Sequence, residues 1–212
     1  MIEVESLGLK DFERLLRELP TQSNAAARMA VNEGANYART LGAGEIAKTV
    51  RLKPAYITGR GNAAARLSVT KRAKDTDLEA VVTGRDRPTS LARFRRGAFA
   101  PNQRGQTRRQ VRVQVSTSGG PKTIPGAFYI RLRQGSASVT EEAYNEGIAV
   151  RLKPGQRIPG KKVMSSLGGG LYTLYGPSVG QVYRSVAADS VPRVGRQMQQ
   201  RFDYHLMRAL RG

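Results

Sequence analysis

Cysteine and tryptophan are absent from this 212-residue sequence, and histidine occurs once. Without cysteine the chain has no disulfides, no thiolate ligands for zinc and no thiol nucleophile. No apolar run approaches the roughly 20 residues that a membrane-spanning helix needs. Residues 1–5 include two glutamates and lack the apolar core of a signal peptide. We therefore expect a soluble chain that is made in the cytoplasm and contacts no membrane.

Side chains for catalysis or metal binding are also scarce. His205, the only histidine, lies in a segment with helical apolar spacing, so we expect an ordinary histidine on a helix surface. The acidic run Asp75–Asp77 with Glu79 lacks the glycine and distal glutamate of a calcium loop. Gly59–Gly61 lacks the GK[ST] ending of a phosphate loop. We expect no enzyme activity, no metal and no cofactor.

Positive charge, in contrast, is abundant. The chain has 36 lysines and arginines against 16 acidic residues, a formal net charge of +20. Residues 85–133 alone hold twelve basic residues and one acidic residue. Such a field attracts nucleic acid, an anionic membrane or an acidic protein surface, but it says nothing about the fold.

Apolar periodicity predicts an α+β protein: N-terminal helices, then a mostly antiparallel sheet with long basic loops, then a C-terminal helix. We expect one domain over residues 1–212, with arms or loops at 1–10, 85–109 and 153–170. Glycines at positions 34, 42 and 44 should divide the second helix. The predicted helices are 11–19, 21–50, 178–186 and 191–210. The predicted strands are 65–70, 78–83, 110–115, 127–132 and 147–152.

The segment Arg93–Phe99 interleaves arginines with two phenylalanines inside the loop expected at 85–109. Arginine contacts phosphate bidentately and aromatic rings stack on unpaired bases, so one interpretation is contact with DNA. The alternatives are docking on an acidic neighbour and plain solvation. Because no sequence-reading motif is present, any DNA contact should be non-specific and salt-sensitive. The candidate residues are Arg85, Arg87, Arg93, Phe94, Arg95, Arg96, Arg104, Arg108 and Arg109.

Two further motifs are Lys122–Phe128 (KTIPGAF) and Leu174–Val179 (LYGPSV). In the first, Pro-Gly suits the centre of a tight turn that leads into a strand. In the second, an extended segment ends at an aromatic residue, a glycine permits a bend and a proline can begin a helix. These residues either pack a strand-to-helix corner or contact another subunit. The candidates for contact are Ile124, Pro125, Phe128, Leu174, Tyr175, Gly176 and Pro177.

In this order, the two motifs resemble the prophage minor tail protein Z family, over roughly residues 21–190. The resemblance implies a structural protein of the phage virion, a tail-completion or neck subunit that acts where the finished tail meets the head. Its implied place is near the terminator ring and the end of the packaged DNA, and its implied fold is a small α+β neck protein. The chain departs from the family in its neutral first twenty residues and in the glycine-bearing insert at 153–170.

The first function hypothesis is therefore a ring around the DNA channel, sixfold by analogy with tail tubes, whose subunits bury their sheet edges against each other. Its partners would be copies of itself, the tail terminator, the tail tube, head-completion or connector proteins and, non-specifically, the packaged DNA end. Assembly would take place in the host cytoplasm. The second hypothesis is a free-standing basic nucleic-acid-binding protein of ribosomal or chromatin type, and composition alone favours neither.

Overall fold

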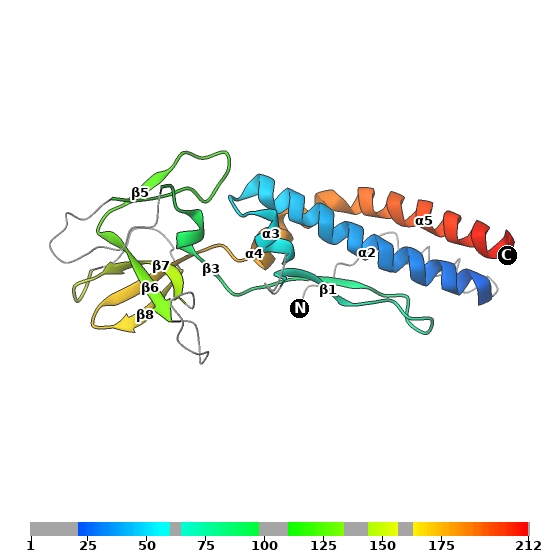
Figure 1. Ribbon diagram of the computed structural model, residues 1–212, viewed down its shortest axis with the longest axis horizontal. Coiled ribbons are helices and arrows are strands. Elements are labelled where there is room, and N and C mark those ends of the chain that lie inside the picture. Colours follow the sequence, from blue (N-terminus) through cyan, green and yellow to red (C-terminus); the bar gives the residue numbers. More distant parts are fainter. Residues whose placement is uncertain (1–20, 60–64, 98–109, 134–143, 157–162, 212) are drawn as a thin grey trace. The chain divides into compact units, whose positions relative to one another are not determined.

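The computed structural model describes residues 21–59, 65–97, 110–133, 144–156 and 163–211 (Figure 1). The chain forms two compact units. Unit 1 comprises Met1–Ala47, Lys53–Asp86 and Val179–Gly212, and unit 2 comprises Lys48–Leu52 and Arg87–Ser178. The predicted α+β class is confirmed. The single domain expected over residues 1–212 stays a prediction.

Unit 1 is mainly helical and contains one β-hairpin. Strands β1 and β2 pair antiparallel, and an isolated bridge between Lys74 and Asp77 closes their turn, which confirms the predicted hairpin. The predicted helix at 11–19 lies outside the described residues. The elements are α2 (Thr21–Thr49, whose last residues belong to unit 2), α3 (Pro54–Thr58), β1 (Leu67–Lys71), β2 (Val81–Gly84), α4 (Val179–Ala187), the 3-10 turn η3 (Ala188–Ser190) and α5 (Val191–Arg211).

Helix α2 is one uninterrupted helix of 29 residues, so the prediction that glycines divide it is wrong. The glycines serve close packing instead. A Cβ atom on Gly34 would lie 2.3 Å from Cγ of Met198 on α5, and one on Gly42 would lie 2.6 Å from the ring of Tyr183 on α4. The buried face of α2 is otherwise rich in alanine, so neighbouring helices can approach its backbone closely. Figure 1 shows α2 and α5 side by side in opposite directions.

Ion pairs between α2 and α5 accompany this packing. Oε2 of Glu33 forms an ion pair with Nε of Arg201 at 2.7 Å, Oε1 of Glu33 lies 3.0 Å from Nε2 of His205, and Arg193 pairs with Glu45 at 3.1 Å. His205 is only 8% exposed. The expectation of a surface histidine is therefore wrong, because the imidazole is enclosed by the helix pair and has a carboxylate partner.

Unit 2 contains a five-stranded antiparallel sheet in the order β3-β9-β7-β6, with β8 also paired to β9, and a separate hairpin β4–β5. The predicted strands at 110–115, 127–132 and 147–152 are confirmed as β4, β6 and β7. Phe94, Ile148 and Leu174 are among its most buried side chains. The elements are β3 (Thr89–Ser90), the 3-10 turn η1 (Leu91–Phe94), β4 (Val111–Val113), β5 (Lys122–Ile124), β6 (Ala127–Arg133), β7 (Tyr144–Arg151), β8 (Val163–Gly168) and β9 (Leu171–Gly176).

The prediction that residues 85–109 and 153–170 form arms or loops is partly wrong. Within 85–109, residues 89–94 form β3 and η1, because Leu91, Ala92 and Phe94 are buried apolar side chains among the arginines. Within 153–170, residues 163–168 form β8, which is held by backbone pairing to β9 rather than by burial of its own side chains. The expected arm at 1–10 lies outside the described residues. In the described part of the chain, none of the helices combines the length and the apolar composition that a membrane span requires.

The tightest backbone approach in unit 1 joins β2 to α4. A Cβ atom on Gly180 would lie 2.7 Å from the carbonyl oxygen of Gly84, and one on Gly84 would lie 2.6 Å from Cα of Gly180. Backbone atoms cannot move aside as a side chain can, so only glycine fits at either position.

We expect Gly180→Ala to lower the free energy of unfolding by about 1–3 kcal/mol, because the added methyl group overpacks this contact. Gly44→Ala is the matched control in α2, where a Cβ atom meets nothing within 4 Å. It should instead stabilise the protein by about 0.5–1 kcal/mol, since alanine is the better helix former. Urea unfolding of both variants checks the contrast, and equal effects would contradict it.

Candidate polyanion-binding site

Charge is divided unequally between the two units. Unit 2 holds 18 lysines and arginines against three acidic residues, a formal net charge of +15. Unit 1 holds 18 against 13, a formal net charge of +5. Three quarters of the excess positive charge therefore lies in unit 2, where few carboxylates are available to neutralise it.

The ion pairs follow the same division. In unit 1, Arg28 pairs with Asp75 at 2.8 Å and Arg184 with Asp86 at 3.0 Å, in addition to the pairs between α2 and α5. In unit 2, the carboxylate of Glu146 on β7 pairs with Arg95. Glu146 is the one acidic residue among the described residues of unit 2.

Three antiparallel segments of unit 2 bring basic side chains to one face. Arg95 forms a β-bridge with Val113, and the backbone N–H of Arg96 donates to the carbonyl oxygen of Arg112 at 2.8 Å. Arg112 in turn lies opposite Thr123 of β5. Directly opposite residues of an antiparallel pair point to the same side, and all three of Arg96, Arg112 and Thr123 are exposed. The inner side of the same hairpin holds buried Val113.

A third arginine borders this face. Nη1 of Arg51 donates to Oε1 of Gln114 at 3.0 Å, and Gln114 lies two residues after Arg112. The backbone N–H of Arg51 also donates to the carbonyl oxygen of Val115 at 2.9 Å. Residues 50–51, which follow helix α2, are thereby fixed beside the end of β4. We call Arg51, Arg96, Arg112, Gln114 and Thr123 the basic face.

The candidate residues of the basic segment are only partly brought together. Arg96 belongs to the basic face, whereas Arg95 turns to Glu146. Phe94 is 1% exposed, which corrects the expectation that its ring could stack on a base. Arg85, Arg87 and Arg93 are exposed outside the basic face, with Arg85 in unit 1 and the other two in unit 2. Arg104, Arg108 and Arg109 lie outside the described residues.

The KTIPGAF motif is a turn between two sheets. Pro125 and Gly126, with φ of +68° at the glycine, join β5 of the small hairpin to β6 of the five-stranded sheet. Ile124 is 7% exposed, and its contact with a partner stays a prediction. Contacts through exposed Pro125 and half-buried Phe128 stay predictions.

The LYGPSV motif packs the interior of unit 2. Leu174 is fully buried, and a Cβ atom on Gly176 would lie 2.6 Å from the ring of Phe94. Both residues are buried within unit 2, and their contact with a partner stays a prediction. Half-buried Tyr175 and Pro177 stay candidates for contact. As predicted, a helix begins shortly after Pro177, at Val179.

Arg51 and Arg112 were missed as candidate residues. Arg51 lies far from the arginine-rich segment in sequence, and only its pairing to residues 114–115 places it there. The alternation Val111-Arg112-Val113 was a usable signal, because a strand with buried valines must turn the arginine outward.

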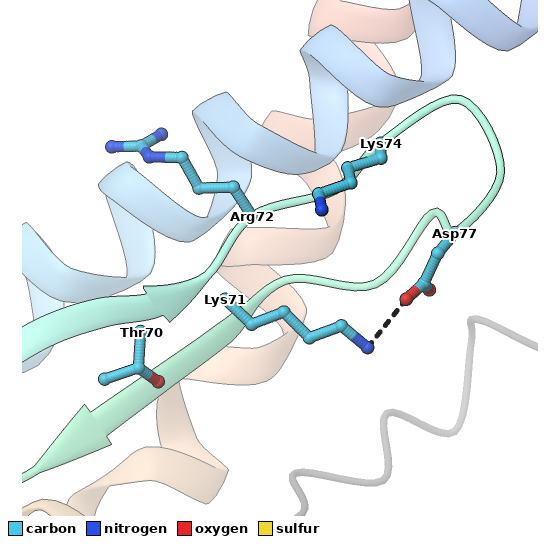
Figure 2. Close-up of a pocket in the computed structure, with 5 residues that line it drawn as sticks. All are labelled: Thr70, Lys71, Arg72, Lys74 and Asp77. Atoms are coloured by element: carbon cyan, nitrogen blue, oxygen red, sulfur yellow. Dashed lines mark ion pairs between the residues drawn. The ribbon is translucent and has the colours of Figure 1, made fainter.

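A separate hollow lies at the tip of the β1–β2 hairpin in unit 1 and is lined by Thr70, Lys71, Arg72, Lys74 and Asp77 (Figure 2). Figure 2 shows the Lys71 side chain pointing to Asp77, with Nζ and Oδ2 2.8 Å apart, and Lys71 also pairs with Glu79. Hydrogen bonds to these carboxylates raise the pKa of Lys71, and the bond from Lys71 lowers the pKa of Asp77. Two of the charged residues that line the hollow, Lys71 and Asp77, are thus paired with each other. No group of three metal-ligating side chains occurs among the described residues.

The lowered pKa of Asp77 predicts a pH dependence. Its contribution to stability is present above the ordinary pKa of 3.8 and is lost as the pH falls through the lower value in the folded state. We expect Asp77→Asn to be slightly less stable than wild type near neutral pH, and the difference to vanish in strong acid. Thermal melts from neutral pH to about pH 2 check this, with the exposed Asp203→Asn as control. A difference that persists at the lowest pH contradicts it.

The burial of Phe94 predicts a structural role. Phe94→Ala should lower the free energy of unfolding by about 3–5 kcal/mol, because it empties the space between η1 and β9. Leu167→Ala, at a side chain that is 49% exposed, should change stability by less than about 0.5 kcal/mol. Denaturant unfolding measures both. Unchanged stability of Phe94→Ala with weakened binding to single-stranded DNA would instead support the stacking role.

The family model for prophage minor tail protein Z matches residues 7–212, nearly the whole chain. This confirms the resemblance inferred from the two motifs. No curated protein and no solved structure matches the chain.

Proposed function

The chain belongs to the prophage minor tail protein Z family, and on that basis we propose that it completes the tail at its head-proximal end. Family membership makes it a structural protein of a phage tail and a component of the virion. The head-proximal position is our proposal, and the excess of positive charge in unit 2 supports it, because DNA enters the tail at that end. The proposed neighbours are the tail terminator, the tail tube and head-completion or connector proteins.

We propose further that the subunits form a ring, and strand β8 supports this. It lies at one end of the sheet and pairs with β9 alone among the described residues. Met164 and Leu167 on it are 37% and 49% exposed, and the strand contains no charged residue or proline. Proteins normally protect edge strands with charge, proline or a cover, since an open edge recruits other chains. An edge without these features is suited to pairing with a neighbour.

The strand directions fit a head-to-tail arrangement. Neighbours in the order β8-β9-β7-β6 are all antiparallel, so β8 and β6, the first and last strands, run in opposite directions. A second copy in the same orientation would therefore bring its β6 antiparallel to β8. Contacts of this heterologous kind close into rings when the rotation between subunits permits it. Sixfold symmetry is the expected closure, by analogy with tail tubes.

The alternative function is a free-standing, non-specific nucleic-acid-binding protein, which the basic face would equally serve. The two differ in self-assembly and in location. Light scattering at low and high salt, with negative-stain imaging, should show one ring size at both salts. Gold-labelled chain in complete particles should lie where head and tail meet. A species that keeps the subunit mass of 23.1 kDa at all concentrations would contradict self-assembly, and label at the distal tip would contradict the proposed position.

Charge placed on β8 should prevent ring formation. We expect the double variant Met164→Lys and Leu167→Lys to sediment at the subunit mass while unfolding at the wild-type temperature, because lysine on an open edge disfavours pairing but costs little in a monomer. Met207→Lys is the matched control, at an equally exposed apolar position (51%) on helix α5. Analytical ultracentrifugation measures both variants, and rings of wild-type size from the β8 variant would show that another surface joins the subunits.

A further inference from the structure

Two arginines of the basic face stand directly opposite each other on adjacent antiparallel segments. The N–H of Arg96 donates to the carbonyl oxygen of Arg112 at 2.8 Å, and both side chains are exposed. Opposite side chains in such a pair have Cβ atoms about 4.5–5.5 Å apart, and like charges placed there destabilise the sheet. The one carboxylate in the described part of unit 2, that of Glu146, is paired with Arg95. No further acidic side chain of unit 2 lies among the described residues to relieve the repulsion between Arg96 and Arg112.

The side chains that surround Arg96 and Arg112 are polar. Thr123 lies opposite Arg112, Gln114 follows two residues later, and Arg51 is held to Gln114. None of the exposed large hydrophobic side chains of the described residues lies in 94–97, β4 or β5. Interfaces between proteins are typically centred on apolar or aromatic side chains. Contacts to nucleic-acid phosphates, in contrast, come mainly from arginine, lysine, serine, threonine, asparagine and glutamine.

We propose that the basic face, with Arg96 and Arg112 at its centre and Arg51 at its border, binds the phosphate backbone of duplex DNA. Guanidinium groups match phosphate oxygens bidentately, and a phosphate between two arginines turns their mutual repulsion into attraction for a shared anion. The proposal deepens the proposed function, on which it rests for the source of the DNA, by naming the ligand of unit 2 and the residues that contact it.

Duplex DNA fits better than single strands. Proteins that bind single strands combine positive charge with aromatic rings on which the bases stack. The aromatic side chain nearest in sequence to this face, Phe94, is buried against Gly176 and unavailable for stacking. Binding through backbone phosphates alone carries no sequence information, so the affinity should be the same for any duplex and should fall steeply with salt.

The test uses the full chain and fluorescence anisotropy with a labelled duplex of random sequence, at several salt concentrations. We expect Arg96→Gln with Arg112→Gln to weaken binding at least about tenfold and to reduce the slope of log K against log salt by about two. The matched control is Arg196→Gln with Arg208→Gln, which removes the same charge from exposed positions on α5 in unit 1. This control should retain most of the affinity and the wild-type slope.

A second measurement separates binding from folding and assembly. Without DNA, the Arg96→Gln and Arg112→Gln variant should melt at or above the wild-type temperature, because it removes a repulsive cross-strand pair. Light scattering on the same samples reports the oligomer, so a failure of ring formation and a failure of DNA binding are read independently. A lower melting temperature would show that the two arginines stabilise the fold, and would overturn their assignment as a ligand site.

Three binding results would also overturn the proposal. Equal loss in the α5 control would mean that net charge alone drives binding. If the chain bound single-stranded DNA more tightly than the duplex, and the double variant lost this affinity as well, the face would contact bases. The third result concerns polyglutamate of the same charge as the duplex. If the wild-type chain binds it as tightly as the duplex, and the double variant loses this binding, the basic face is a site for an acidic protein.

Discussion

The close approach of neighbouring elements to the backbone of α2 and α4 is the constraint on which unit 1 depends. Gly42 admits the ring of Tyr183, Gly34 admits Met198, and Gly180 meets Gly84. Larger residues at these positions would move α4 and α5 outward, and the pairs that join Glu33 and Glu45 to α5 would lengthen with them. The salt bridges therefore follow from the packing rather than cause it, as expected for partly exposed ion pairs, which contribute little by themselves.

Acidic residues are concentrated in the same unit, and this explains where positive charge stays unpaired. Carboxylates of unit 1 neutralise its arginines locally, so unit 1 presents a mixed surface. Unit 2 has three acidic residues in its sequence, and Glu146 is taken by Arg95. The positive field that composition predicts for the whole chain thus comes mainly from unit 2, whereas unit 1 contains many paired charges.

Much of the fold was predictable from local patterns: alternation gave the β1–β2 hairpin and β4, β6 and β7, and 3.6-residue spacing gave α2, α4 and α5. The errors share a cause, since they concern residues whose role is set by partners distant in sequence. Gly34 and Gly42 look like helix breakers until Met198 and Tyr183 are placed against them. Strand β8 has no alternation of apolar and polar residues because neither of its faces is buried. Phe94 is a core residue, but the arginines that flank it in sequence make the segment look like an exposed loop. Arg51 reaches the basic face only through a bond to Gln114.

The basic face and strand β8 have the same physical character. Each keeps a feature that a monomer optimised only for stability would lose: two opposed arginines in one case, an uncharged open edge in the other. Local choices that oppose stability are expected where function requires them, because selection retains them only if a partner supplies the missing interaction. The partners that we propose are a strand of a neighbouring copy for the edge and a phosphate anion for the arginines. A subunit that joins copies of itself and faces DNA needs both, and unit 2 carries them on different segments: β8 for the first, and β4 with the adjacent residue Arg96 for the second.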